Sequence, residues 1–173
     1  MIKKAMPAGR QGFSLLETIV AIAILVTAVV GPLTLASSGL KASSSAKNNL
    51  IAANLAQEAI ELIRNIRANN LLANKDWING LGNPAAGNVC FASAGCRVDA
   101  ITLQVFSCDS VSCLITSDGG LYTHDTGVPT FFTRKINLEN IVSNREIKIK
   151  ATVAWKERFG DQKVELEEQM FNW

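Results

Sequence analysis

The chain has 173 residues and a mass of 18.6 kDa, which is the size of one domain with an appendage. Hydrophobic residues make up 48% of the sequence and charged residues 18%, and the mean hydropathy of +0.18 is too high for a disordered chain. The formal net charge of +2 comes from 17 basic and 15 acidic residues, a balance that argues against nucleic-acid binding through a charged face. This composition indicates a segment that lies in lipid or in a protein assembly.

The first twelve residues differ in charge from the rest of the chain. They contain Lys3, Lys4 and Arg10 and no acidic residue. A basic stretch followed by an apolar one is the layout of an export signal, and the positive charges orient the apolar stretch with its N-terminus in the cytoplasm. The bulk of the chain is therefore predicted to be exported.

The apolar stretch is longer than the core of an ordinary secretory signal. From Thr18 to Leu40 there are 23 residues without a charge. At about 1.5 Å per residue, a helix of this length crosses a hydrocarbon layer of roughly 30 Å, whereas a signal core has only about 7 to 15 residues. We predict that this stretch is a membrane-spanning helix.

Glu17 stands at the beginning of this apolar stretch, with Phe13, Leu15 and Leu16 before it. A carboxylate that enters lipid without a partner is costly, so an acidic residue at this position is a functional hypothesis by default. The alternative is that Glu17 lies at the level of the lipid headgroups and has no further role.

The segment 12–17 reads Gly-Phe-Ser-Leu-Leu-Glu, and it lies between a short basic leader and an unbroken apolar helix. This arrangement resembles the N-terminal signature of type IV prepilins and type II secretion pseudopilins, and its finer features are closer to the minor subunits. In that family a prepilin peptidase cleaves after the glycine and methylates the new N-terminus. The resemblance therefore implies cleavage between Gly12 and Phe13 and an N-methylated Phe13.

The resemblance also implies a role for Glu17 in assembly. The new α-amino group of Phe13 would be cationic near neutral pH, and it can pair with Glu17 of a neighbouring subunit or of its own chain. The expected organisation is a leader at 1–12, a transmembrane and assembly helix at 13–40, an amphipathic continuation of the helix at 41–68, and an exported loop and β-sheet region at 69–173.

The helix is predicted to continue past the apolar stretch. Apolar residues recur every three or four positions, which places them on one helix face. They are Ile51, Leu55, Ala59, Leu62 and Ile66. Gly31-Pro32 should kink the helix or melt it locally, because a proline removes a backbone hydrogen bond. The alternative is an ordinary membrane-helix proline, which a helix in lipid tolerates. An asparagine- and glycine-rich region predicts that the helix ends within 68–70.

Strand patterns follow a variable loop at 69–97, in which Trp77 is predicted to anchor the loop on the core. Residues 98–106 and 131–138 favour strands, and alternation over 147–155 predicts a half-buried strand. A turn at 158–161 leads to a returning strand, so that Lys148 and Lys150 can pair with Glu165 and Glu167. The fold class is therefore α+β: a long N-terminal helix packed on a small antiparallel sheet, which is also the layout of pilins.

The sequence contains four cysteines, all in the part predicted to be exported. They are Cys90, Cys96, Cys108 and Cys113. An even number in an exported domain favours disulfides over free thiols, and the spacing lacks the tight pairs of a zinc site. Of the three connectivities, local pairing of Cys90 with Cys96 and of Cys108 with Cys113 is preferred, followed closely by the nested arrangement.

No pattern in the sequence indicates an enzyme. The single histidine, His124, is isolated, and the sequence has no nucleophile elbow, metal triad or phosphate-binding loop. Asp118-Gly119-Gly120 with Asp125 suggests a calcium loop but lacks the ordered ligands of an EF-hand, so a glycine-rich turn is preferred. We predict neither a cofactor nor a metal.

The expected function is structural: a minor pilin or pseudopilin that joins a type IV pilus-like filament through its N-terminal helix. Two alternatives remain, a pseudopilin of a type II secretion system and a signal-anchored surface domain that binds a ligand without polymerising. The resemblance implies as partners a prepilin peptidase, other pilin or pseudopilin subunits and an inner-membrane assembly platform. The expected location is the inner membrane, crossed once with the C-terminal domain outside the cytoplasm, and then a surface or periplasmic filament.

Overall fold

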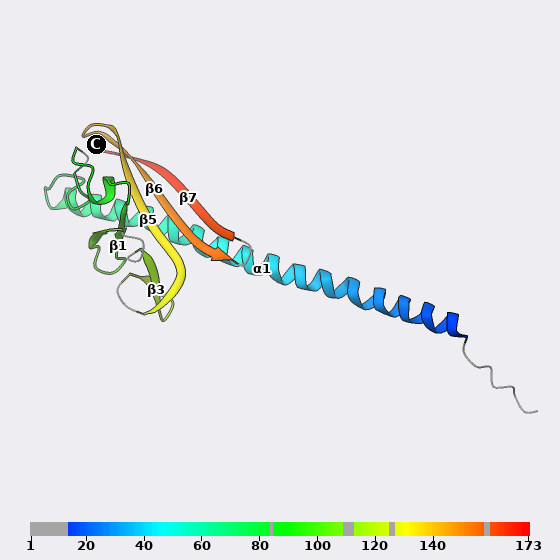
Figure 1. Cartoon of the computed structure of the whole chain (residues 1–173). Helices are drawn as coiled ribbons and strands as arrows, with labels where there is room; N and C mark the ends of the chain where they lie inside the picture. The colour runs from blue at the N-terminus through cyan, green and yellow to red at the C-terminus, as the bar shows by residue number, and fades with distance from the viewer. Residues whose placement is uncertain (1–13, 84, 109–112, 125–126, 158–159) are drawn as a thin grey trace, which may run out of the picture. The chain divides into compact units, whose positions relative to one another are not determined.

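The chain forms two units, Met1–Ala46 and Lys47–Trp173, in a computed structural model. One helix, α1 (Leu15–Leu72), contributes residues to both units (Figure 1). The structure describes residues 14–83, 85–108, 113–124, 127–157 and 160–173. The predicted cleavage site, Gly12 and Phe13, lies outside these residues, and so do Asp125 and the first half of the turn predicted at 158–161.

Helix α1 is unbroken over its whole length. It passes through Pro32 without local melting, which agrees with the alternative of a tolerated proline, and the Thr34 hydroxyl donates a hydrogen bond of 2.7 Å to the Gly31 carbonyl. The helix ends at Leu72, two residues beyond the predicted end. Asn74 follows with a positive φ of 53°, which turns the chain out of the helix.

In the described part of the chain, seven strands form one antiparallel sheet. They are β1 (Cys96–Val98), β2 (Val105–Ser107), β3 (Leu114–Asp118), β4 (Leu121–Thr123), β5 (Val128–Val142), β6 (Glu146–Glu157) and β7 (Gly160–Phe171). A short 3-10 helix, η1 (Val89–Phe91), precedes β1. Strand β5 pairs with β6 along one edge and with β3 and β1 along the other, and β7 adds to the far side of β6. The predicted α+β class is confirmed.

The core of the second unit lies between α1 and the sheet. Strand β6 buries alternate residues from Ile147 to Trp155, as its sequence pattern predicts. Four of the five predicted apolar helix positions are fully buried in the same cluster, and Ile51 packs at its margin. Ala52 and Ala56 are also fully buried, and together with Ala59 these small residues let the helix approach the sheet closely.

The loop after α1 is attached to the core by Trp77, which is buried as predicted. Its indole Nε1 donates to Asn144 Oδ1 at 3.3 Å, in the turn between β5 and β6. The Asn70 side-chain amide donates to the carbonyls of Trp77 and Asn79 at 3.3 and 2.8 Å. These bonds hold the beginning of the loop against the end of the helix.

Residues 98–106 do not form the single strand that their β propensity predicts. Strand β1 ends at Val98 and β2 begins at Val105, because the Asp99 carboxylate folds the intervening residues into a turn. Asp99 Oδ1 accepts hydrogen bonds from the backbone N–H groups of Ile101 and Thr102 at 3.0 and 2.8 Å. A carboxylate that binds its own following backbone favours a turn over a continuous strand.

The predicted hairpin of β6 and β7 is confirmed, with one correction to its charge pairing. Lys150 lies opposite Glu167 in register, and its Nζ is 3.3 Å from Glu165 and 3.7 Å from Glu167. Lys148 instead pairs with Glu139 of β5 at 2.6 Å, because its register partner on β7 is the uncharged Gln169. The prediction was right for Lys150 and wrong for Lys148.

Candidate functional site

The first part of α1 exposes an unusually apolar surface. Every described residue from 14 to 44 is exposed. The large hydrophobic residues of this segment are Leu15, Leu16, Ile19, Val20, Ile22, Ile24, Leu25, Val26, Val29, Val30, Leu33, Leu35 and Leu40. Within the described ranges, α1 is the single helix long and apolar enough to cross a membrane. An exposed apolar surface of this size is typical of a segment that contacts a membrane or another protein.

The hydroxyl side chains between residues 18 and 38 bond to the backbone of their own helix. Thr27 donates to the Ala23 and Ile24 carbonyls at 3.0 Å, and Ser38 donates to the Thr34 carbonyl at 2.8 Å. Hydroxyls that bond back to the preceding helical turn are compatible with an apolar surrounding, because they leave no free donor.

Glu17 is the exception on this surface. It lies in the first turn of α1 and is exposed. Its predicted partner, the amino group of Phe13, lies outside the described residues, and the assembly role of Glu17 therefore stays a prediction.

A second polar feature, which sequence reasoning missed, lies inside the second unit. Arg134 of β5 has only 1% of its side chain exposed, and its Nη1 is 3.0 Å from the Glu58 carboxylate of α1. Its Nη2 donates to the Val98 carbonyl at 3.3 Å. Burial lowers the pKa of Arg134, and the adjacent Glu58 charge opposes that effect. The ion pair fixes the position of the helix along the sheet.

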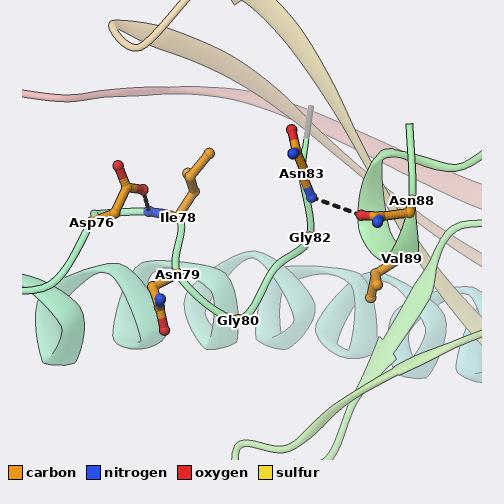
Figure 2. A pocket seen from close by; sticks show the side chains of 8 residues that line it. All are labelled: Asp76, Ile78, Asn79, Gly80, Gly82, Asn83, Asn88 and Val89. Atoms are coloured by element: carbon orange, nitrogen blue, oxygen red, sulfur yellow. Dashed lines mark hydrogen bonds between the residues drawn. The ribbon is translucent and has the colours of Figure 1, made fainter. Parts of the chain in front are cut away.

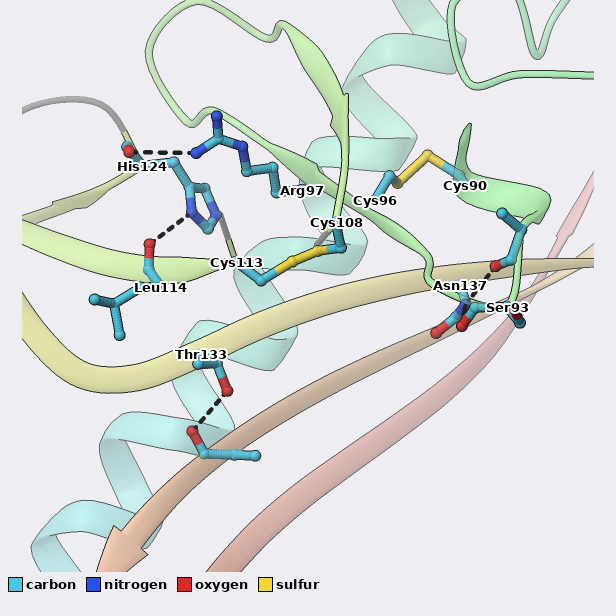
Figure 3. Close-up of a disulfide and its surroundings, with 12 residues drawn as sticks. Cys90, Ser93, Cys96, Arg97, Cys108, Cys113, Leu114, His124, Thr133 and Asn137 are labelled. Atoms are coloured by element: carbon cyan, nitrogen blue, oxygen red, sulfur yellow. Dashed lines mark hydrogen bonds between the residues drawn. A yellow bond between two sulfur atoms is a disulfide. The ribbon is translucent and has the colours of Figure 1, made fainter. Parts of the chain in front are cut away.

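His124 and Asp99 lie close to Arg134 and complete this buried polar cluster. The imidazole is buried, and because a carbonyl can only accept, the ring donates through Nδ1 to the Leu114 oxygen at 3.1 Å (Figure 3). Burial, and then the charge of Arg134, lower the pKa of His124 to about 4, and Arg97 adds to the effect while Asp99 opposes it. His124 is therefore neutral near pH 7.

Asp99 remains ionised although it is buried. Desolvation would raise the pKa of its carboxyl group, but hydrogen bonds from Thr102, Ile101 and the His124 backbone outweigh burial and hold the pKa below its usual value. The cluster thus combines a buried cation, a buried anion and a neutral imidazole. Its contacts join α1, β1, β3 and β5.

The four cysteines form two disulfides within the described residues, Cys90–Cys96 and Cys108–Cys113 (Figure 3). This is the local connectivity that the sequence analysis preferred. The Cα–Cα distances of 4.5 and 5.4 Å lie in the normal range for disulfides. The first bridge is fully buried in the core and ties η1 to the start of β1. The second joins Cys108, the residue after β2, to Cys113, the residue before β3.

The loop between α1 and β1 contains a pocket of about 620 Å³, lined on one side by Asp76 and Asn79 and on the other by Asn83 and Asn88 (Figure 2). These polar groups are engaged in local turns: Asp76 accepts from the Ile78 N–H at 3.0 Å, and Asn88 from the Asn83 N–H at 2.7 Å. Among the described residues no group of three or more histidine, cysteine or acidic side chains is placed to hold a metal ion. The calcium motif considered at Asp118 forms a tight hairpin turn between β3 and β4.

Comparison of the chain with protein-family models, with curated proteins and with solved structures finds no match. The candidate functional surface is therefore the exposed apolar part of α1 with Glu17 at its beginning.

Removing the Glu58 carboxylate is expected to destabilise the second unit. In Glu58→Gln the Arg134 charge stays buried without its partner. Because 36% of the Glu58 side chain is exposed and water can partly replace it, we expect a loss of about 2–3 kcal/mol, below the range for fully buried pairs. Urea unfolding monitored by tryptophan fluorescence measures it. A companion variant, Glu61→Gln, alters an exposed glutamate of the same helix and should change stability by less than about 0.5 kcal/mol; an equal loss in both variants would contradict the role of the pair.

The stability of the second unit is expected to fall as the pH drops from about 6.5 to about 4. The pKa of His124 is about 4 in the folded protein and near 6.5 in the unfolded chain, so the unfolded chain binds more protons in this interval. The groups that face the ring are Arg97, Asp99 and Arg134. In His124→Asn the amide keeps the donor but cannot titrate, and the variant should lose most of the pH dependence. If the stability of this variant depends on pH as strongly as that of the wild type, other titrating groups cause the dependence.

Proposed function

We propose that this protein is a structural subunit of a type IV pilus-like filament, a minor pilin or pseudopilin. It is inserted in the membrane as a precursor, is processed before Phe13, and then assembles through α1. The observation that carries the proposal is the exposure of the entire apolar segment of α1, with a single carboxylate, Glu17, at its first turn. The Gly-Phe-Ser-Leu-Leu-Glu sequence at 12–17 supports it from the residues alone.

The two surroundings that such a subunit meets require the same helix surface. In the bilayer the segment contacts lipid, and in a filament it contacts the helices of neighbouring subunits. Leucine, isoleucine and valine side chains are apolar enough for both, so transfer from one to the other exchanges apolar contacts for apolar contacts. Glu17 is the group that distinguishes the two states, because it gains a cationic partner only when an amino group is placed beside it.

The disulfides support a location of the second unit outside the cytoplasm. Structural disulfides form and persist in oxidising compartments, and the Cys90–Cys96 bridge is fully buried. The basic residues Lys3, Lys4 and Arg10 precede the apolar segment and favour the same orientation. Prepilin peptidase, other pilin-like subunits and an inner-membrane assembly platform are the partners of this proposal.

The substitution Glu17→Ala is expected to leave export and membrane insertion intact but to reduce incorporation into filaments about tenfold or more, since the amino terminus of a subunit loses its counter-ion. Incorporation is measured as the ratio of protein in sheared filaments to protein in membranes. The matched control is Glu61→Ala, which removes another exposed glutamate of α1 outside the apolar segment and should incorporate normally. Equal incorporation of Glu17→Ala and wild type would exclude the assembly role of this residue.

A further inference from the structure

The hairpin of β3 and β4 ends in a tip that has no role in the domain core. Gly119 and Gly120 form the turn, with φ values of 57° and 100° and open space around both. Asp118 lies directly opposite Leu121 in the strand pairing, so their side chains are on the same side of the hairpin. Leu121 is 65% exposed, and no ion pair or side-chain hydrogen bond of Asp118 occurs among the described residues. The tip presents an apolar side chain beside a free carboxylate.

A pocket of about 360 Å³ lies at the other end of β5. It is lined by Val142, Arg145, Glu146, Phe171, Asn172 and Trp173. Trp173 is 83% exposed and stacks on Phe171 with ring centroids 5.4 Å apart. Arg145 is exposed and makes no side-chain ion pair or hydrogen bond within the described part of the chain. Phe171 is half-buried, and the Arg67 guanidinium lies over the Trp173 ring, 5.1 Å from its centroid. The pocket therefore presents the exposed edge of the Trp173 indole beside the Arg145 guanidinium.

The walls of this pocket are held in place. The Asn172 backbone N–H donates to the Arg145 carbonyl at 2.9 Å, and the Asn172 amide donates to the Asn144 carbonyl at 3.1 Å. Trp77, which is buried in the core, donates to the Asn144 side chain in the same turn. A recess whose backbone is fixed in this way loses little entropy when it binds a partner.

The tip and the pocket cannot meet within one molecule. Strand β3 pairs with the first residue of β5, since Ser117 lies opposite Val128, whereas the pocket adjoins Val142 at the last residue. Fourteen residue steps of a strand separate the two by about 46 Å. In Figure 1, β3 lies at one end of β5, and the C-terminus lies beside the β5–β6 turn at the other end.

We propose that the β3–β4 hairpin tip of one copy docks into the C-terminal pocket of a second copy. Leu121 enters the recess against Trp173 and Val142, and the Asp118 carboxylate pairs with the Arg145 guanidinium. The second copy is the occupant because one chain carries both complementary surfaces, apolar to apolar and acidic to basic. Glu146 also lines the pocket, and the five donors of a guanidinium can serve two carboxylates.

This inference rests on the proposed assembly role and adds a contact between second units to the packing of α1. The two surfaces differ, so the interface is heterologous. Heterologous contacts that do not close into a ring continue as an open chain of subunits, as a filament requires.

The test places a photo-crosslinking amino acid at position 121 of the full-length protein in native membranes. The expected product is a dimer in which residue 121 is joined to residues 142–146 or 171–173 of another copy, identified by peptide mass. The matched control is the same probe at Ile101, which is 66% exposed and lies in the turn after β1. Crosslinks from position 121 to lipid, to another protein, or to other residues of this chain would overturn the proposal, as would a dimer yield equal to that of the control.

Charge exchange tests the pairing itself. Asp118→Arg and Arg145→Asp should each lower the dimer yield at least about fivefold, and mixing the two variants should restore it, because the new arginine of one copy meets the new aspartate of the other. Failure of the mixture to restore crosslinking would overturn the pairing. If the protein is found in sheared filaments but gives no crosslink from position 121, the docking contact is refuted and the proposed function is not. If the crosslink forms in membranes but no protein enters filaments, the docking contact is supported and the proposed function is contradicted.

Discussion

One continuous helix must satisfy two different surroundings, and the rest of the structure depends on this constraint. Residues 15–40 of α1 have no polar face and remain exposed, whereas from Ala52 onward one face is buried against the sheet. The second half must therefore be held firmly by its own domain. Close packing at Ala56 and Ala59 and the Arg134–Glu58 ion pair supply that attachment.

The parts of the fold that the sequence predicts are those in which a local pattern decides the outcome. Apolar residues recur at helical spacing from Leu55 to Ile66 and at every second position along β6. Because each pattern repeats over several residues, only one face of the helix and one face of the strand can be buried. Trp77 follows the same logic, because a large apolar ring in a polar loop has a strong drive toward the core. The sequence favoured local disulfides only slightly over the nested arrangement, and the structure has the local ones.

The parts that were missed depend on contacts between distant segments. Asp99 splits a β-prone run because its carboxylate binds the following backbone. Strands β3 and β4 are short; β3 pairs with the distant β5, and β4 pairs with β3. The burial of Arg134 could have been predicted, because Arg134 lies two residues from Phe132 and two from Ile136 and therefore points to the same buried face of the strand. Its partner Glu58, on the helix, is evident only once the helix and the sheet are brought together. Glu17 is indicated by the sequence because a charge at the start of an apolar segment conflicts with its surroundings, and its assembly role stays a prediction.

The most direct test is to isolate the protein from native membranes that contain its prepilin peptidase and to measure the mass of its N-terminal peptide. The account predicts a mature chain that begins at an N-methylated Phe13 and has lost residues 1–12, since Glu17 needs the new amino group as its partner. A membrane-inserted protein that retains Met1 would contradict it. That result would assign the apolar segment of α1 to a plain membrane anchor for a surface domain that does not polymerise.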